Sequence, residues 1–179
     1  TSKLVRMLKT FTKEELKEFE KFVASPYFAR GRNLVPFLKV LKKFHPEFDR
    51  DSFINRNIFS ELYPGKAFRD KSSNNLIKTL SYELIKMAEL FFTLNKFMTD
   101  TNTKNYYLLN SFREKKLYAE FEKKYSEADS HIKKTHGGSL YDFNDNYYLL
   151  DAYNEYCIDV RKYKSAFETI AAQDEISVT

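Results

Sequence analysis

The chain has 179 residues and a net charge of +5, with only four glycines, four prolines and one cysteine. So few turn-forming residues argue against a β-rich fold, and a lone cysteine excludes an internal disulfide. We therefore expect an all-α protein with no sheet. No apolar stretch is long enough to predict a membrane span, so we expect a cytoplasmic protein without a membrane partner.

The first helix with a clear start is expected at Thr12. In F-T-K-E-E-L, residues 11–16, Thr12 and Glu15 match a capping box, in which each side chain accepts a hydrogen bond from the other residue's backbone amide. Phe11 and Leu16 occupy the hydrophobic positions that flank such a box. An apolar stripe continues from there and ends before Pro26.

Two shorter helices are expected next. One begins near Asn33 and has Pro36 in its first turn, where proline is tolerated. The other has Asp51 or Ser52 as its N-cap and ends before Pro64.

The longest apolar pattern runs from Lys71 to Met98, with Asp70 as the expected cap. One face is spaced by threes and fours: Leu76, Leu80, Leu84, Met87, Phe91, Leu94 and Met98. A second face is formed by Ile77, Ile85, Ala88 and Phe92. We expect this helix to be the central strut of its lobe, with its second half contacted on more than one side.

Charge divides the chain into two predicted lobes. Residues 1–100 hold 19 Lys and Arg against 12 Asp and Glu, whereas residues 101–179 hold 11 against 13. The sign changes at T-D-T-N-T-K, residues 99–104, which is rich in capping and turn residues. We expect a basic N-terminal helical bundle over 1–100 and a second helical lobe over 101–179.

The second lobe contains an internal repetition. The pentapeptide N-Y-Y-L-L occurs at 105–109 and again at 146–150, an offset of 41 residues. Such spacing predicts stacked antiparallel helical hairpins. A later similarity, between 116–122 and 162–168, has an offset of 46, so the repeat is irregular and its second leading helix should be longer by about one turn.

Residues 163–167, Y-K-S-A-F, follow a helix with Ala152 and Tyr156 and resemble the start of the second helix of a tetratricopeptide repeat. The helix-interior glycine and terminal proline of that family are absent, so the resemblance is degenerate, and generic helical hairpins explain the pattern equally well. Two units are fewer than such stacks usually need. Either the basic lobe caps them or the native chain continues beyond Thr179.

The first lobe carries a separate resemblance. Its segments E-F-E-K-F-V-A-S-P-Y-F (18–28), F-H-P-E-F (44–48) and I-F-S-E-L-Y-P-G-K-A-F-R-D (58–70) resemble the N-terminal region of a family of larger uncharacterised bacterial proteins. In that family a helical region precedes tetratricopeptide-like helices. The resemblance implies a bacterial source and this architecture, and it implies no activity.

Residues suited to catalysis or metal binding are sparse. His131 and His136 are five apart, which does not match helical metal ligands, and His136 precedes two glycines that suit a helix end. Cys157 lies inside a predicted helix and is expected in the core. We therefore expect no metal, no cofactor and no enzymatic activity.

The tyrosines indicate a binding function. Because a tyrosine joins an apolar ring to a polar tip, tyrosines on helical hairpins are suited to line a groove that receives a peptide or helix from another protein. The predicted groove residues are Tyr106, Tyr107, Tyr147, Tyr148 and Tyr156. We expect a non-catalytic interaction or scaffold module.

The alternative function is that of a DNA-binding regulator. The helix that starts near Asp70 opens with polar residues and lies next to several basic ones, which suits contacts to phosphates or base edges. The predicted nucleic-acid contacts are Lys66, Arg69, Lys71 and Lys78. A solvated turn before a core helix explains the same residues, so another protein is the favoured partner.

Overall fold

The structure, a computed structural model, describes residues 2–28, 31–48, 53–135 and 140–178. Within these ranges the chain forms nine α-helices and no strand, which confirms the predicted all-α class. Its contacts separate two compact units, residues 1–95 and 96–179.

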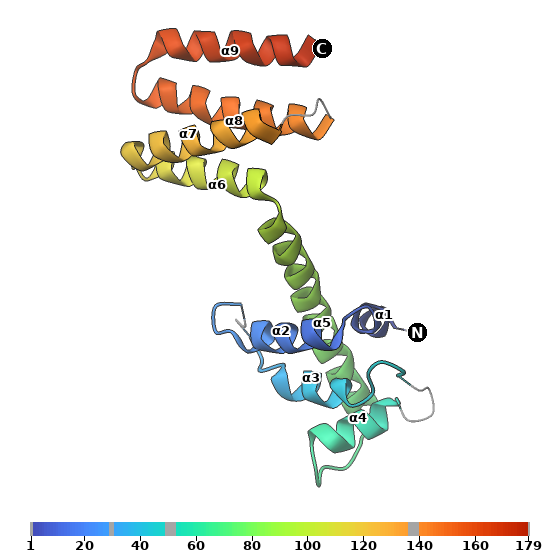
Figure 1. Cartoon of the computed structure of the whole chain (residues 1–179). Coiled ribbons are helices and arrows are strands. Elements are labelled where there is room, and N and C mark those ends of the chain that lie inside the picture. The colour runs from blue at the N-terminus through green and yellow to red at the C-terminus, as the bar shows by residue number, and fades with distance from the viewer. Residues whose placement is uncertain (1, 29–30, 49–52, 136–139, 179) are drawn as a thin grey trace. The chain divides into compact units, whose positions relative to one another are not determined.

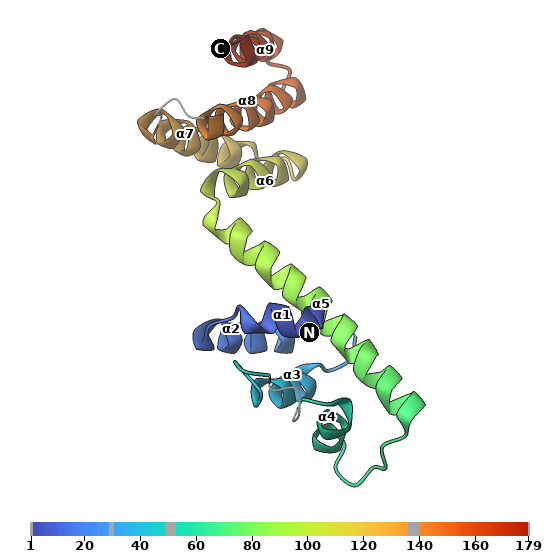
Figure 2. The ribbon, with the colours of Figure 1, turned by 90° about the vertical axis from the view of Figure 1, so that its right-hand side faces the viewer.

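Unit 1 contains α1 (Lys3–Lys9), α2 (Lys13–Ala24), α3 (Val35–Lys42), α4 (Asn55–Leu62) and most of α5 (Asp70–Thr99). Figures 1 and 2 show the four short helices gathered along α5. They bury one apolar core against it, whose fully enclosed members include Leu8, Phe19, Phe37, Leu38, Ile58 and Leu84.

The capping box at the start of α2 is confirmed. The Thr12 hydroxyl accepts the Glu15 amide at 3.1 Å, and the Glu15 carboxylate accepts the Thr12 amide at 2.7 Å. Phe11 and Leu16 are both buried, as a hydrophobic staple requires. The start of α2 is therefore determined by residues within five positions of one another.

The starts of α3 and α4 differ in how they are capped. Before α3, the Asn33 side chain accepts the Val35 amide at 3.1 Å, and Pro36 lies in the first turn as predicted. The cap residue of α4 is Ile54, which provides no side-chain hydrogen bond. The predicted caps Asp51 and Ser52 lie outside the described residues.

The predicted long helix is α5, and Asp70 is its first residue instead of its cap. Burial follows one stripe, Ile77, Leu80, Leu84, Ala88 and Phe91. In the predicted second face, only Ile77 and Ala88 are fully buried. Phe92 is partly exposed, although its ring stacks on Phe11.

Unit 2 contains the last turn of α5 and then α6 (Thr101–Glu114), α7 (Tyr118–Thr135), α8 (Leu140–Asp159) and α9 (Tyr163–Val178). Asp100 leaves the helical conformation and caps α6, with its carboxylate accepting the Thr103 amide at 2.9 Å and the Thr103 hydroxyl at 2.6 Å. These hydrogen bonds hold the pKa of Asp100 below its usual value. The division at 95/96 lies five residues before the predicted one after residue 100.

The four helices of unit 2 form two hairpins that close in the same way. Lys116 (φ 58°) and Arg161 (φ 61°) take the left-handed conformation just after α6 and α8. After each, the next amide bonds back to the fifth preceding carbonyl, from Leu117 to Phe112 and from Lys162 to Cys157, both at 2.8 Å. This is a Schellman motif, here with a basic residue in place of glycine.

The lengths of α6 and α8 agree with the drift in the sequence offset. From Asn105 to the end of α6 at Glu114 is 114 − 105 = 9 residues, and from Asn146 to the end of α8 at Asp159 is 159 − 146 = 13. The difference of four residues is about one helical turn. The predicted extra turn in the second leading helix is confirmed.

Candidate functional site

Four of the five predicted groove tyrosines lie together on α6 and α8. The Tyr106 ring is 5.3 Å from that of Tyr148 and 5.5 Å from that of Tyr107, and Tyr147 is 6.2 Å from Tyr148. Phe97, from the last turns of α5, extends the row at 5.9 Å from Tyr107. We call these five residues the aromatic surface.

The aromatic surface is exposed and held in place. Tyr107 is 58% exposed, Tyr148 is 50% and Tyr147 is 40%. Tyr106, between them, is half-buried, and its hydroxyl donates to Asp151 on α8 at 3.3 Å. Burial, and then the Asp151 carboxylate, raise the pKa of Tyr106, so this hydroxyl stays protonated and joins α6 to α8.

The prediction that Tyr156 lines the same groove is wrong. Tyr156 is 2% exposed, its ring stacks on Phe121 at 4.4 Å, and its hydroxyl donates to Glu122 on α7. Nine residues separate it from Tyr147, which corresponds to about half a revolution around α8. Tyr156 therefore faces α7 and belongs to the core of unit 2.

The four predicted nucleic-acid contacts do not share one pocket. Lys66 and Arg69 line a pocket of about 490 Å³ that is bounded by α4, the loop after it and the start of α5. Lys78 lines a different pocket of about 350 Å³, and Lys71 lines neither of the two. A duplex-binding stripe would require these cations to follow one line of phosphates.

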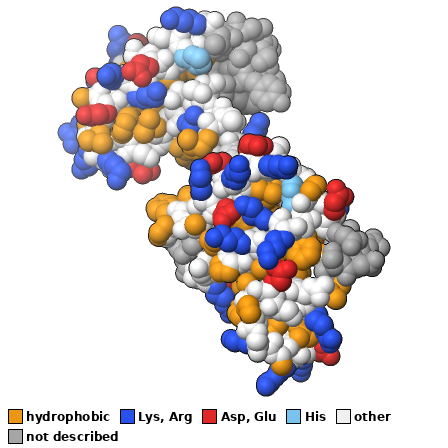
Figure 3. Space-filling model, turned by 60° about the horizontal axis from the view of Figure 1, so that its bottom comes forward, with side chains coloured by type: hydrophobic (Ala, Val, Ile, Leu, Met, Phe, Trp, Pro, Cys, Tyr) orange, Lys and Arg blue, Asp and Glu red, His pale blue; other side chains and the backbone are white. Residues whose placement is uncertain are grey.

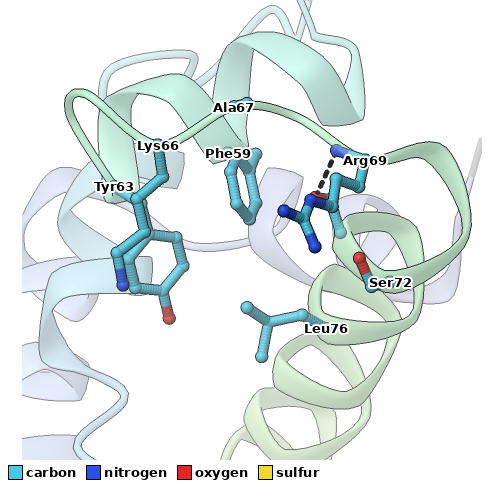
Figure 4. Close-up of a pocket in the computed structure, with 8 residues that line it drawn as sticks. Phe59, Tyr63, Lys66, Ala67, Arg69, Ser72 and Leu76 are labelled. Atoms are coloured by element: carbon cyan, nitrogen blue, oxygen red, sulfur yellow. Dashed lines mark hydrogen bonds between the residues drawn. The ribbon is translucent and has the colours of Figure 1, made fainter.

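The larger pocket combines rings with basic and hydroxyl groups (Figure 4). Its lining is Phe59, Tyr63, Lys66, Ala67, Arg69, Ser72, Ser73 and Leu76. The Arg69 guanidinium points into the space between Phe59 and Ser72, and the Arg69 amide donates to the Ser73 hydroxyl at 2.9 Å. The Lys66 ammonium lies 5.1 Å from the centre of the Tyr63 ring.

The remaining reactive residues occupy structural positions. Cys157 is fully buried, and this burial raises the pKa of its thiol. His45 hydrogen-bonds with the Phe11 carbonyl oxygen at 3.1 Å. His136 lies outside the described residues. In the part of the chain that the structure describes, no three His, Cys, Asp or Glu side chains are placed to hold a metal, and no helix is long and apolar enough to cross a membrane.

Fold and sites together define an all-helical protein of two units, one with a basic pocket and one with an aromatic surface. Comparisons with protein-family models, curated proteins and solved structures find no match to this chain.

Two parts of these sites were not found by sequence reasoning. Phe97 joins the aromatic surface because the chain leaves α5 at Asp100 and turns into α6, and no sequence signal pairs it with Tyr107. Phe59, Tyr63 and Leu76 form the apolar wall of the pocket. The turn Y-P-G-K at 63–66 marked where α4 ends, but it did not indicate a cavity.

Proposed function

We propose that this chain is a non-catalytic interaction module, whose aromatic surface binds a peptide or helix of another protein. The observation that carries the proposal is that three exposed tyrosines on α6 and α8 are connected into a row by the half-buried Tyr106. Neighbouring rings restrict one another's motion, so little side-chain entropy remains to be lost when a partner covers them.

The chemistry of the row suits a protein partner. Tyrosine is enriched at protein interfaces because its ring buries a large apolar area and its hydroxyl still finds a hydrogen bond. The exposed rings of Tyr107 and Tyr148 offer such area, while Tyr106 and Asp151 connect the two supporting helices. A partner that presents apolar side chains flanked by hydrogen-bonding backbone or side-chain groups fits this surface.

The paired helices of unit 2 support a further part of this proposal. Hairpins α6–α7 and α8–α9 close with the same backbone motif at Lys116 and Arg161, which suits a short tetratricopeptide-like stack. The single buried cysteine suits the reducing cytoplasm of a bacterium, where we place the protein.

Selection of peptides from a displayed library on the immobilised full chain tests the function. Tyr107→Ser and Tyr148→Ser should each weaken binding of the selected peptides by about tenfold or more, because central interface tyrosines often act as hot spots. Affinities measured by calorimetry with the purified variants give the comparison.

Tyr82→Ser is the matched control. Tyr82 is also a helical tyrosine and is 61% exposed, but it lies in unit 1. This variant should bind the selected peptides as the wild type does. A library that yields no binder, or binders that are insensitive to Tyr107→Ser and Tyr148→Ser, would show that the aromatic surface is not the binding site.

DNA binding through the start of α5 is the weaker second proposal. It is supported by Lys66 and Arg69, which pair with no carboxylate among the described residues, and it is weakened by the placement of Lys78 at another pocket. Duplex binding that falls steeply as salt rises would support it. Absence of duplex binding at low salt would exclude it.

A further inference from the structure

The pocket between α4 and the start of α5 has two chemically different sides. Phe59, Tyr63 and Leu76 present apolar groups, and Arg69 and Ser72 face them from the chain that enters α5 (Figure 4). A volume of about 490 Å³ is in the range of small-ligand sites. Such sites are mostly apolar, with a few polar groups that orient the ligand.

The positive charge at this pocket is not neutralised within the described residues. Neither Lys66 nor Arg69 forms an ion pair there. Glu61, the acidic residue of α4, pairs instead with Lys43, the residue that directly follows α3. Figure 3 shows lysine and arginine side chains spread over the visible face of unit 1 among hydrophobic ones. An anion that enters the pocket therefore meets an unpaired guanidinium.

The surroundings make this guanidinium a good anion site. Arginine presents planar donors that fit phosphate and carboxylate in a two-pronged arrangement. Arg69 is exposed, so water screens part of this attraction, and the apolar groups beside it, such as Phe59, contribute contact area to the ligand.

The first turn of α5 adds one hydroxyl group, that of Ser72, on the same side. Its leading backbone amides have no carbonyl partner within the helix, and anions are favoured at such an end. The Ser73 hydroxyl already takes part in a hydrogen bond, because it accepts the Arg69 amide at 2.9 Å. The Ser72 hydroxyl lines the pocket. Asp70, the acidic residue of this turn, is not among the lining residues.

We propose that this pocket binds a small ligand in which a phosphate or carboxylate group is attached to a flat apolar body. Arg69 and Ser72 hold the anionic group, and Phe59, Tyr63 and Leu76 contact the body. The site lies within unit 1 and does not depend on the aromatic surface of unit 2.

A discrete ligand fits the geometry better than a duplex. The guanidinium is directed into the space between Phe59 and Ser72, and Lys78 lies at a separate pocket on α5. Contacts to a nucleic-acid backbone would need cations that follow one line of phosphates, and the exposed Arg69 and Lys78 lie at different pockets.

The test is a titration of the full chain with four probes, followed by amide NMR. The probes are phenyl phosphate, phenylacetate, inorganic phosphate and benzyl alcohol. At least one of the first two should saturate and shift the signals of Arg69 and Ser72, and comparing them identifies the preferred anion. Inorganic phosphate and benzyl alcohol should each bind at least about tenfold more weakly, because each lacks one half of the proposed ligand.

Two variants with the same change in charge make the test specific. Arg69→Gln should weaken binding by about tenfold or more, since it removes a charge-assisted bidentate contact. Lys78→Gln, at the other pocket, should leave it unchanged. Circular dichroism verifies that both variants keep the helical fold.

Three results would overturn the proposal. One is no saturable binding of either aromatic anion by the wild-type chain. Another is equal weakening by Arg69→Gln and Lys78→Gln, which would indicate a general charge effect. The third is displacement of the bound probe by a DNA duplex whose tighter binding also requires Arg69, which would assign the site to nucleic acid.

Discussion

At the scale of single residues, Tyr156 shows how one side chain joins a core to a charged pair. Its ring stacks on Phe121, while its hydroxyl donates to Glu122, which also pairs with Lys162 at 3.0 Å. The Tyr156 hydroxyl first, and Lys162 second, hold the pKa of Glu122 below its ordinary value. The three residues connect α7, α8 and the turn before α9.

Tyr156→Phe keeps the ring and removes this hydrogen bond. We expect a loss of about 1 kcal/mol in the free energy of unfolding, at the low end for a charged acceptor because the Glu122 side chain is 54% exposed. Urea unfolding at pH 7 measures it. Tyr163→Phe is the control, because Tyr163 is an exposed tyrosine beyond the same turn, and it should have no effect.

The same variant has a defined pH dependence. Because the pKa of Glu122 is lowered in the folded state, its interactions stabilise the protein above the ordinary glutamate range and lose this effect as pH falls through the lowered pKa. The difference between wild type and Tyr156→Phe should be largest above about pH 5 and shrink toward about pH 3. A difference that stays constant over this range would contradict the role of the ionised carboxylate.

At the scale of elements, the two hairpin turns place a side chain where glycine is favoured. A left-handed conformation costs an L-residue roughly 1–2 kcal/mol. Glycine avoids this strain but loses more backbone entropy on folding, so a change to glycine recovers only part of the cost. The cost at Lys116 and Arg161 is offset by the two hydrogen bonds that close each turn. Backbone geometry at these turns therefore outweighs local preference.

Lys116→Gly should raise the free energy of unfolding by about 0.5–1 kcal/mol. Lys115→Gly, one position earlier, should lower it, because Lys115 has a negative φ of −87° that gains nothing from glycine. Thermal unfolding of both variants provides the measurement. If both substitutions destabilise the chain equally, the left-handed turn is not a source of strain.

At the scale of the whole molecule, stability comes from two separate apolar cores. The core of unit 1 is centred on α5 with Leu84 fully buried, and that of unit 2 includes Leu109, Phe121 and Cys157. Aromatic contacts are frequent in both, such as Phe11 against Phe19 at 5.2 Å and Tyr125 against Tyr153 at 4.4 Å. The high aromatic content is thus used largely for packing.

Leu84→Ala should cost unit 1 about 2–5 kcal/mol, since it leaves a cavity in a closely packed core. Leu90→Ala lies on the same helix at a position that is 38% exposed, and it should cost much less. Hydrogen exchange of the unit 1 amides measures both. Equal losses from the two substitutions would contradict the assignment of Leu84 to the centre of this core.

The parts of the fold that were predictable are those determined by near neighbours. The capping box at Thr12 and Glu15 and the long helix from residue 70 follow from a spacing of three residues or from a sustained apolar period. The extra turn of α8 follows from the change in the repeat offset from 41 to 46 residues. The predicted grouping of Tyr106, Tyr107, Tyr147 and Tyr148 agrees with the structure because the repeated pentapeptide lies in the leading helix of each hairpin.

The sequence by itself determined that this chain is helical, where α2 begins, where the long helix α5 runs, and which pentapeptides carry neighbouring tyrosines. Only the tertiary structure decided that Tyr156 turns inward to Phe121 and Glu122, and that Arg69 shares a pocket with Phe59 and Leu76. The physical reason is the distance along the chain over which each kind of interaction acts. Capping and periodicity act over a few residues, whereas burial and pockets depend on helices that approach from distant parts of the chain.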